Sequence, residues 1–373
     1  MNVLHVHSGN MFGGVERMLQ TLAPATAGRT PISSSFALCF EGRVSETLHA
    51  AGGEVYPLGP VRARRIGEIR RARRILTDTL RTEEWGAAIV HSAWAQAIFG
   101  QTIIGTGTPL VRWLHAPQPG PRWLEYWSAR STPALVLCNS RYTCSAVGTG
   151  LGDVPRAVVY PPAAAHAPQR DARQTIRKAL GAAADAVVIV ISARMESWKG
   201  HELLLESLAA LPGGRWEAWV IGGPQGHSER RYFNALVQRA DTAGLGARVR
   251  FLGQRSDVST LLEASDIYCQ PNRGPEPFGL SFVEALAAGL PVVTSRLGAA
   301  PEIVDDSCGV LVDAGLPGAL TEVLSQLIQH DDRRRTMSIA ARERSRQFCD
   351  LPGSLRHLAV ELGRVSVTAT ART

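Results

Sequence analysis

Residues 272–295 read NRGPEPFGLSFVEALAAGLPVVTS and contain a loop, a helix and the start of a buried strand. Gly and Pro predict the loop, a helix is expected to begin at Gly279 and to break at Gly289, and the apolar run that follows predicts the strand. Glu276 and Glu284 stand on either side of the loop-to-helix junction. A helix that leads into a buried strand is the repeating unit of an α/β fold.

The same alternation runs along the whole chain. Short apolar runs that predict buried strands occupy 3–7, 36–40, 87–92, 110–115, 134–140 and 157–161, and then 186–193, 216–223, 249–253, 266–271, 291–295 and 309–312. Segments with helical periodicity separate these runs. The sequence therefore predicts α/β architecture with parallel sheets covered by helices on both faces.

The chain is long enough for two domains. The Pro/Ala-rich segment 161–172 predicts a linker between two Rossmann-like domains, 1–165 and 172–350. A helix over about 353–373 follows the second sheet, and we expect it to cross back to the first domain. Ligands of open α/β sheets bind beyond the carboxyl ends of the strands, which predicts a site between the two halves.

Composition indicates a soluble globular protein, with 45% apolar and 20% charged residues. The net charge is +7, and residues 1–170 contain 17 Arg against 10 acidic residues, so the excess lies in the first half. This asymmetry predicts an anionic partner for that half. Six cysteines without a C-x-x-C pair, and a first strand that begins directly at the N-terminus, predict a cytoplasmic protein with reduced thiols and no signal peptide.

Two cations follow the strand 186–193. Arg194 stands at its carboxyl end, and Lys199, one of only two lysines in the chain, opens a helix with Gly200. Cations beside a helix start suit a pyrophosphate, whereas the alternative is a solvated loop. The unpaired N–H groups near Gly279 suit a phosphate as well.

Carboxylates beside such an anion site should bind hydroxyl groups, as in a ribose diol or a sugar. Glu276 and Glu284 are placed for this role, and a nucleotide sugar has all of the matching parts. The alternative for Glu284 is a capping box formed with Ser281, in the pattern S-x-x-E.

Two further candidates lie in the first half. Gly13 and Gly14 fall in a strand–loop–helix segment, which is either an ordinary turn or a phosphate-facing loop; the segment lacks the G-x-G-x-x-G pattern of dinucleotide-dependent hydride transfer. His115 is the last residue of the predicted strand 110–115 and is either structural or catalytic. The sequence contains no D-x-D motif, so no metal site is expected, and it contains no P-loop or G-x-S-x-G motif.

Taken together, these segments resemble the GT-B retaining glycosyltransferases of family 4, also called glycosyl transferases group 1. EPFGLSFVE (276–284) is similar to the E-x7-E signature of that family, and GAAPEIV (298–304) resembles its GG-x-x-E-I-V segment with Ala in place of a Gly. RMESWKG (194–200) matches the family's Arg and Lys pair, and FGGVER (12–17) matches its N-terminal Gly-Gly loop. The resemblance covers nearly the whole chain in order.

The resemblance implies a role for each candidate. Glu284 would hold the ribose hydroxyls, while Arg194 and Lys199 would bind the diphosphate together with amides near Gly279 and Leu280. Glu276 would contact the hydroxyls of the donor sugar. In the first, acceptor-binding domain, Gly13 and Gly14 would border the phosphate and His115 would lie near the reacting sugar.

The implied activity is a metal-independent, retaining hexosyl- or N-acetylhexosaminyltransferase in the synthesis of an envelope polysaccharide or glycoconjugate. Its co-substrate is a nucleotide-diphospho-sugar, and no cofactor is expected. A GT-B sugar-nucleotide epimerase and a non-catalytic nucleotide-sugar binder are the alternatives. The donor sugar and the acceptor, whether glycan, lipid-linked or small molecule, are left open.

Segment 61–80 holds seven of the arginines, between Arg62 and Arg74. Ile66, Ile69, Ile75 and Leu76 predict an apolar stripe at helical spacing. The helix is either a solvated outer helix or a basic surface that contacts anionic lipid at the inner face of the cell membrane or an anionic acceptor. No groove-reading motif accompanies the charge, so no nucleic-acid partner is expected.

Overall fold

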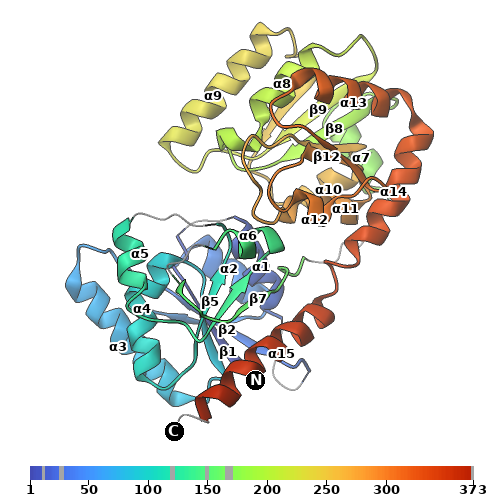
Figure 1. The fold of residues 1–373 in the computed structure, drawn as a ribbon. Helices are drawn as coiled ribbons and strands as arrows, with labels where there is room; N and C mark the ends of the chain where they lie inside the picture. Colours follow the sequence, from blue (N-terminus) through green and yellow to red (C-terminus); the bar gives the residue numbers. More distant parts are fainter. Residues whose placement is uncertain (11–12, 25–28, 118–121, 148–150, 164–170, 371–373) are drawn as a thin grey trace. The chain divides into compact units, whose positions relative to one another are not determined.

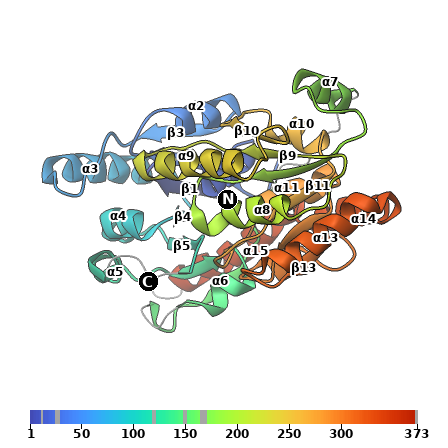
Figure 2. The ribbon, with the colours of Figure 1, turned by 90° about the horizontal axis from the view of Figure 1, so that it is seen from above.

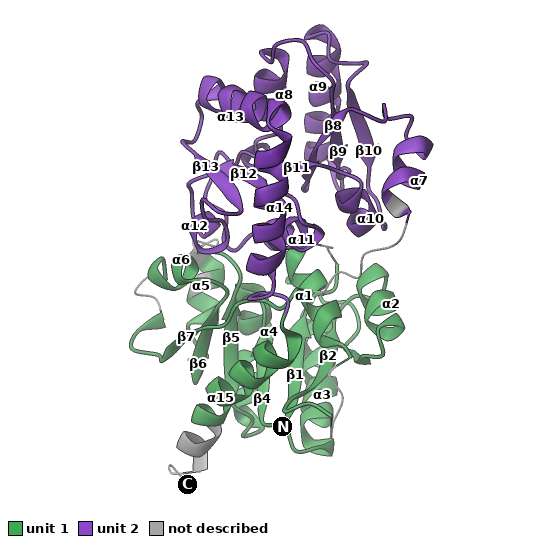
Figure 3. Ribbon diagram, turned by 90° about the vertical axis from the view of Figure 1, so that its right-hand side faces the viewer, with its two compact units in different colours: residues 1–163, 350–373 green, residues 164–349 purple. Residues whose placement is uncertain are grey.

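A computed structural model describes residues 1–10, 13–24, 29–117, 122–147, 151–163 and 171–370. The chain forms two compact units: unit 1 comprises residues 1–163 and 350–373, and unit 2 comprises residues 164–349 (Figures 1 and 3). Each unit contains one sheet, in which all strand pairs are parallel. The predicted α/β class with two Rossmann-like sheets is confirmed.

The sheet of unit 1 has the order β3-β2-β1-β4-β5-β6-β7. Its strands are β1 (Asn2–His7), β2 (Ser33–Leu38), β3 (Glu54–Pro57), β4 (Ala87–Val90), β5 (Leu110–Leu114), β6 (Leu135–Cys138) and β7 (Arg156–Val158). Successive strands are added on one side of β1 up to β3 and then on the other side from β4, so the topological switch point lies between β1 and β4.

Helices cover both faces of this sheet. They are α1 (Gly14–Leu22), α2 (Arg43–Ala50), α3 (Ile66–Thr82), α4 (Ala93–Gly105), α5 (Arg122–Ser128), α6 (Arg141–Ser145) and α15 (Leu351–Thr370). Side chains of α1, α2 and α15 share one apolar core, and those of α3 and α4 share another. The C-terminal helix thus returns to unit 1, where Leu355, Leu358 and Leu362 are buried at helical spacing.

The sheet of unit 2 has the order β10-β9-β8-β11-β12-β13, and its switch point lies between β8 and β11. Its strands are β8 (Val187–Ser192), β9 (Trp216–Ile221), β10 (Val249–Gly253), β11 (Ile267–Gln270), β12 (Val292–Ser295) and β13 (Gly309–Val312). Its helices are α7 (Ala172–Ala179), the short 3-10 helix η2 (Ser197–Lys199), α8 (His201–Ala209), α9 (His227–Thr242), α10 (Val258–Glu263), α11 (Leu280–Ala288), α12 (Ala300–Ile303), α13 (Pro317–Gln329) and α14 (Asp331–Ser345).

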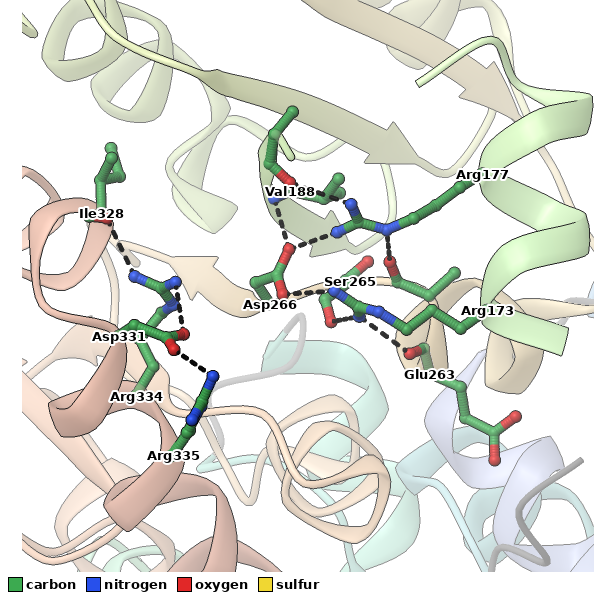
Figure 4. Close-up of polar contacts among 12 residues, drawn as sticks. Arg173, Arg177, Val188, Glu263, Ser265, Asp266, Ile328, Asp331, Arg334 and Arg335 are labelled. Atoms are coloured by element: carbon green, nitrogen blue, oxygen red, sulfur yellow. Dashed lines mark hydrogen bonds and ion pairs between the residues drawn. The ribbon is translucent and has the colours of Figure 1, made fainter. Parts of the chain in front are cut away.

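Charged hydrogen bonds attach α7 to this sheet (Figure 4). Asp266, directly before β11, accepts from Arg177, from Arg173 at 2.6 Å and from the amide of Val188 at 2.8 Å. Arg177 is buried and also donates to the carbonyl oxygens of Ala264 and Ala186. The first helix after the predicted linker is therefore held to the amino ends of β8 and β11.

Within the described ranges, no helix has both the length and the apolar character needed to cross a membrane. Residues 164–170 of the predicted linker lie outside the described residues.

Candidate functional site

The switch point of unit 2 brings together two of the predicted residues. β8 ends at Ser192 and is followed by Arg194 and η2, whereas β11 ends at Gln270 and is followed by the loop that carries Glu276. Because β8 and β11 are neighbours and parallel, both loops leave the same edge of the sheet. This edge at a switch point is where open α/β sheets bind ligands.

Lys199 and Glu276 form an ion pair at this edge. Lys199 Nζ lies 2.7 Å from Glu276 Oε2, and the two side chains are 14% and 8% exposed. The same carboxylate oxygen accepts hydrogen bonds from Asn272 Nδ2 at 2.9 Å and Gln270 Nε2 at 3.2 Å. Lys199 was predicted at the diphosphate and Glu276 at the sugar, whereas their contact and the two amide donors were not predicted from the sequence.

A close backbone approach makes this contact possible. Gly200 has φ +81°, and a Cβ at this position would lie 1.9 Å from the carbonyl oxygen of Pro271. On the other side of the lysine, Trp198 accepts a hydrogen bond from the amide of Arg273 at 2.7 Å, and its ring lies 3.9 Å from Lys199 Nζ. Glycine is therefore required where the β8 loop meets the β11 loop.

The helix α11 begins as the sequence predicts. Gly279 has a left-handed conformation, with φ +97°, and precedes Leu280, the first helical residue. Intrahelical bonding starts with the amide of Phe282, which donates to the carbonyl oxygen of Gly279. The first amides of this helix belong to Leu280 and Ser281, and such groups bind phosphate oxygens in other proteins.

The capping-box alternative for Glu284 is wrong. Ser281 is the second residue of the helix, not its N-cap, and its hydroxyl donates to Gln270 Oε1 at 3.2 Å. Glu284 lies on the second turn and is partly exposed. Burial raises the pKa of Tyr268, and the negative charges of Glu276 and Glu284 raise it further. Both carboxylates are therefore close enough to this buried phenol to disfavour its ionised form.

Arg194 is held in a different way from Lys199. Its guanidinium donates to Glu229 in the first turn of α9 at 2.8 Å and lies 3.2 Å from Glu196. Glu229 also accepts from the amide of Gln225 at 2.6 Å. Arg194 Nε is buried and has no hydrogen-bond partner among the residues that the structure describes. The two predicted cations therefore pair with separate carboxylates.

In unit 1, Gly13 and Gly14 form the start of α1. Gly13 is the N-cap, and its amide donates to Glu16 Oε2 at 2.7 Å. The other oxygen of Glu16 lies 3.3 Å from His7 Nε2. Glu16 and His7 were not predicted from the sequence; the available signal was Glu16, three residues after the first glycine of the Gly-Gly pair.

His115 lies directly after β5, and its backbone carbonyl accepts from Asn139 Nδ2 at 3.0 Å. Its Nε2 lies 2.8 Å from Nδ1 of His91, a residue that the sequence analysis did not select. His91 follows β4 and in turn contacts His5 of β1. Burial lowers the pKa of His115 to about 3, and the charges of His7 and Arg112 act in the same direction. The imidazole is therefore neutral at physiological pH.

The basic helix α3 differs in detail from the predicted stripe. Ile66 is 64% exposed, so it is not part of the apolar face, whereas Leu76 is fully buried and Ile69 and Ile75 pack on the core. Arg73 Nε donates to the carbonyl oxygen of Ile98 in α4 at 2.7 Å, which makes this arginine a packing residue.

Glu68 pairs with Arg62 and Arg65 at 3.0 Å. The exposed arginines Arg64, Arg70, Arg71 and Arg74 complete the predicted basic segment.

The second half of the chain matches a known protein family. Residues 172–344 match the family model described as glycosyl transferases group 1. Two relatives are D-inositol 3-phosphate glycosyltransferases: one from Corynebacterium diphtheriae is 33% identical over 48% of this chain and 43% of its own length, and one from Mycobacterium bovis is 36% identical over 47% and 37%. The chain thus spans less than half the length of these relatives.

Solved structures cover nearly the entire chain. Anabaena HepE in complex with UDP and glucose has a TM-score of 0.87 at 23% identity, with 98% of this chain and 100% of that chain covered. A glycosyltransferase from Rickettsia africae has a TM-score of 0.82 at 18% identity, with 98% of each chain covered. At these identities the likeness shows the fold, which is the GT-B arrangement of two Rossmann-like sheets.

Proposed function

We propose that this chain, whose residues 172–344 match the model of the glycosyl transferases group 1, is a glycosyltransferase of that group and moves a sugar from a nucleotide-diphospho-sugar to an acceptor hydroxyl. The observation that carries this proposal is the Lys199–Glu276 pair, held by Asn272 and Gln270 at the switch point of unit 2. A cation, a buried carboxylate and a helix start at one sheet edge match the three chemical parts of such a donor.

Each part of the donor has a partner in this proposal. Lys199 has three N–H donors, so it can bond Glu276 and a phosphate oxygen at the same time. Leu280 and the next amide of α11 offer N–H groups to the diphosphate, and Arg194 supplies a second cation. Glu284 accepts from the ribose hydroxyls, and Glu276 accepts from hydroxyls of the sugar.

The proposed chemistry is a front-face displacement that retains the anomeric configuration. The bond between the sugar C1 and the phosphate oxygen breaks, the acceptor oxygen bonds C1 on the same face, and the departing phosphate oxygen takes the acceptor's proton. Such a reaction depends on positioning and on stabilising negative charge on the leaving group. Lys199 and the amides of α11 supply that charge stabilisation. Metal independence is proposed because these groups meet the phosphate charge and the sequence has no D-x-D motif.

A UDP-hexose is the first donor to test. The similar HepE structures hold UDP, UDP-glucose, or UDP and glucose, and these ligands belong to that protein. We extend them to this chain as a proposal, with UDP-N-acetylhexosamine as the alternative donor.

We place the protein at the cytoplasmic face of a membrane, where unit 1 meets an anionic lipid-borne acceptor used in envelope glycoconjugate synthesis. Arg70, Arg71 and Arg74 of α3 are exposed. Along the same side of unit 1, α3 packs beside α4 and α4 beside α5 (Figures 1 and 2). On α5, Trp123, Tyr126 and Trp127 are 54%, 66% and 48% exposed. Arginine beside exposed Trp and Tyr is typical of surfaces that contact lipid headgroups.

A ligand panel tests the donor. UDP-, GDP-, ADP- and dTDP-sugars are each added in excess EDTA, and the melting temperature is measured; the cognate donor should raise it. Proton NMR of the transfer product should show the donor's anomeric configuration retained. A change in the donor sugar without any acceptor would instead identify an epimerase, and binding without turnover would identify a non-catalytic binder.

Sedimentation with phosphatidylglycerol or neutral vesicles tests the lipid contact. Binding to the anionic vesicles should fall at high salt and in a variant with Arg70, Arg71 and Arg74 changed to Ser. Arg73 is kept because it holds α3 to α4. If the protein sediments with neither vesicle type, the proposed lipid contact is refuted.

A further inference from the structure

Three histidines form an unbroken hydrogen-bonded row across the switch point of unit 1. His5 Nδ1 lies 3.0 Å from His91 Nε2, and His91 Nδ1 lies 2.8 Å from His115 Nε2. The rings are stacked, with centroid distances of 5.2 and 5.1 Å. The residues come from β1 and from the carboxyl ends of β4 and β5, which are neighbours in the sheet.

The two ends of the row differ. His5 is fully buried and stacked on Phe36, and its Nε2 has no hydrogen-bond partner among the described residues. His115 is partly exposed. The row therefore connects a closed interior end to an end that solvent or a ligand reaches.

A row of neutral imidazoles has a direction. Each neutral ring carries one N–H and one bare nitrogen, so every contact needs one donor and one acceptor. If His115 donated inward, the sequence of bonds would end with an N–H on His5 Nε2, buried without an acceptor. Buried N–H groups without partners are rarer than acceptors that lack a bond. The favoured direction therefore has His5 Nδ1–H donating to His91 and His91 Nδ1–H donating to His115 Nε2.

We propose that His5 and His91 are positioning residues that hold His115 as a neutral imidazole with its proton on Nδ1, so that His115 presents an N–H donor to a substrate oxygen at the carboxyl edge of the unit 1 sheet. The identity of that oxygen rests on the proposed function, whereas the position of the proton on the ring is inferred from the hydrogen bonds among His5, His91 and His115. In this arrangement His115 is not a general base, because its Nε2 lone pair accepts from His91, and it is not a general acid, because the neutral ring has no imidazolium proton to give.

The surroundings favour the neutral row. Burial lowers the pKa of His5 to about 3 and holds that of His91 well below its usual value, with like-charge repulsion from His115, His5 and His7 adding to the effect. Arg112 of β5 is a further positive neighbour of His115.

The acidic group near the row is engaged elsewhere. His7 Nδ1 accepts from the amide of Gly9 at 3.1 Å, which places its proton on Nε2, facing Glu16 at 3.3 Å. Glu16 therefore pairs with His7 and the amide of Gly13.

Nitrogen-15 NMR of the full chain labelled at histidine tests the proposal directly. The two ring nitrogens of a neutral imidazole have well-separated shifts, so the spectrum shows which one carries the proton; a spectrum of His115→Gln assigns the signals of His115. Wild-type His115 should show a protonated Nδ1 and a bare Nε2 at pH 7. A protonated Nε2, or two protonated nitrogens, would overturn the proposal.

Two substitutions of His91 separate the effect of its hydrogen bond to His115 from the effect of changing its side-chain size. The side-chain nitrogen of Asn occupies the place of Nδ1, so His91→Asn keeps a donor to His115, whereas His91→Gln places its amide at the Nε2 position and removes that donor. We expect His115 to keep its Nδ1 proton in His91→Asn and to shift toward the other tautomer in His91→Gln. An unchanged His115 tautomer in a folded His91→Gln protein would contradict the proposal. If His91→Gln fails to fold, His91→Leu, which also removes the donor to His115, makes the same test.

Activity provides an independent readout. His91→Gln should lower kcat about ten- to a hundredfold with a small change in KM, as is typical when a group that orients a functional histidine is removed. His91→Asn should lose less, and His49→Gln, on the exposed part of α2, is the matched control. If the protein turns over no nucleotide sugar but the histidine tautomers are as expected, the proposed function is wrong and the proposed direction of the histidine hydrogen bonds is right. Turnover of a nucleotide sugar together with the other His115 tautomer would refute only the proposed direction of the histidine hydrogen bonds.

Discussion

Lys199 and Glu276 are 77 positions apart in the chain, and their charged atoms lie 2.7 Å apart. Both belong to loops that leave the carboxyl edge of unit 2, from neighbouring strands β8 and β11. A lysine held by a buried carboxylate keeps a fixed position, with N–H donors left for a second anion. Preorganised positive charge of this kind stabilises a departing phosphate without reorganisation during the reaction.

Lys199→Met should reduce turnover more than it reduces stability. Met keeps an unbranched side chain at this position but removes the charge, and loss of one such group typically costs about 10²–10³ in rate. Steady-state kinetics with the donor found in the ligand panel measures the effect. Lys178→Met, at the only other lysine and on an exposed position of α7, is the control and should behave as wild type. Equal kcat values in both variants would remove Lys199 from the mechanism.

Gly200→Ala should disturb the same contact through the backbone. The added Cβ would lie 1.9 Å from the carbonyl oxygen of Pro271, and the positive φ strains any L side chain. We expect a loss of at least about 1–3 kcal/mol in the free energy of unfolding, together with weaker donor binding. Gly213→Ala is the control, because its Cβ would meet no atom within 4 Å. Similar melting curves for both variants would show that the approach of the two loops is not constrained as described.

Asp266→Ala should destabilise unit 2. The substitution leaves the buried guanidinium of Arg177 without its carboxylate, and breaking a buried ion pair from one side costs about 3–5 kcal/mol. Denaturant unfolding measures the loss. The control is Glu343→Ala in the exposed Glu343–Arg346 pair, where little change is expected. A loss for Asp266→Ala no larger than that of the control would mean that α7 is not held by this network.

The histidine row should make the protein less stable in mild acid. Burial lowers the folded-state pKa of His5 and of His115 to about 3 and holds that of His91 well below the ordinary value of 6.5, so the unfolded state binds more protons than the folded state as the pH falls below about 6.5. Their contribution to stability is complete above pH 6.5 and is lost as the pH falls. In His91→Asn the slope of unfolding free energy against pH between 5 and 6 should decrease by about 1.4 kcal/mol per pH unit. An unchanged slope would mean that His91 is protonated in the folded protein.

Much of the fold could be predicted because buried parallel strands are short apolar runs. The strand β3, with the sequence EVYP, was missed because its residues are only partly buried or exposed and show no apolar run. The return of α15 to the first domain was expected because a helix follows the completed second sheet, but the residues that it packs against came only from the structure.

The site was predictable as single residues and not as contacts. Lys199 and Glu276 were each selected from local motifs, but their pairing depends on the adjacency of β8 and β11, which periodicity does not reveal. The same holds for His5 in β1, His91 directly after β4 and His115 directly after β5, because the topology sets the order of these three strands. Glu229, the partner of Arg194, lies on a helix that carries no motif.

Calorimetric titration of UDP-glucose in excess EDTA, into wild type and Glu284→Gln, tests the central claim most directly. Wild type should bind saturably, and Glu284→Gln should bind about ten- to a hundredfold more weakly, since a hydrogen bond to a charged group contributes about 1.5–3 kcal/mol. Glu322→Gln, at an exposed position on α13, should bind as wild type does. If neither UDP-glucose nor any other nucleotide sugar of the panel binds, or if Glu284→Gln binds with unchanged affinity, the carboxyl edge of unit 2 is not the donor site.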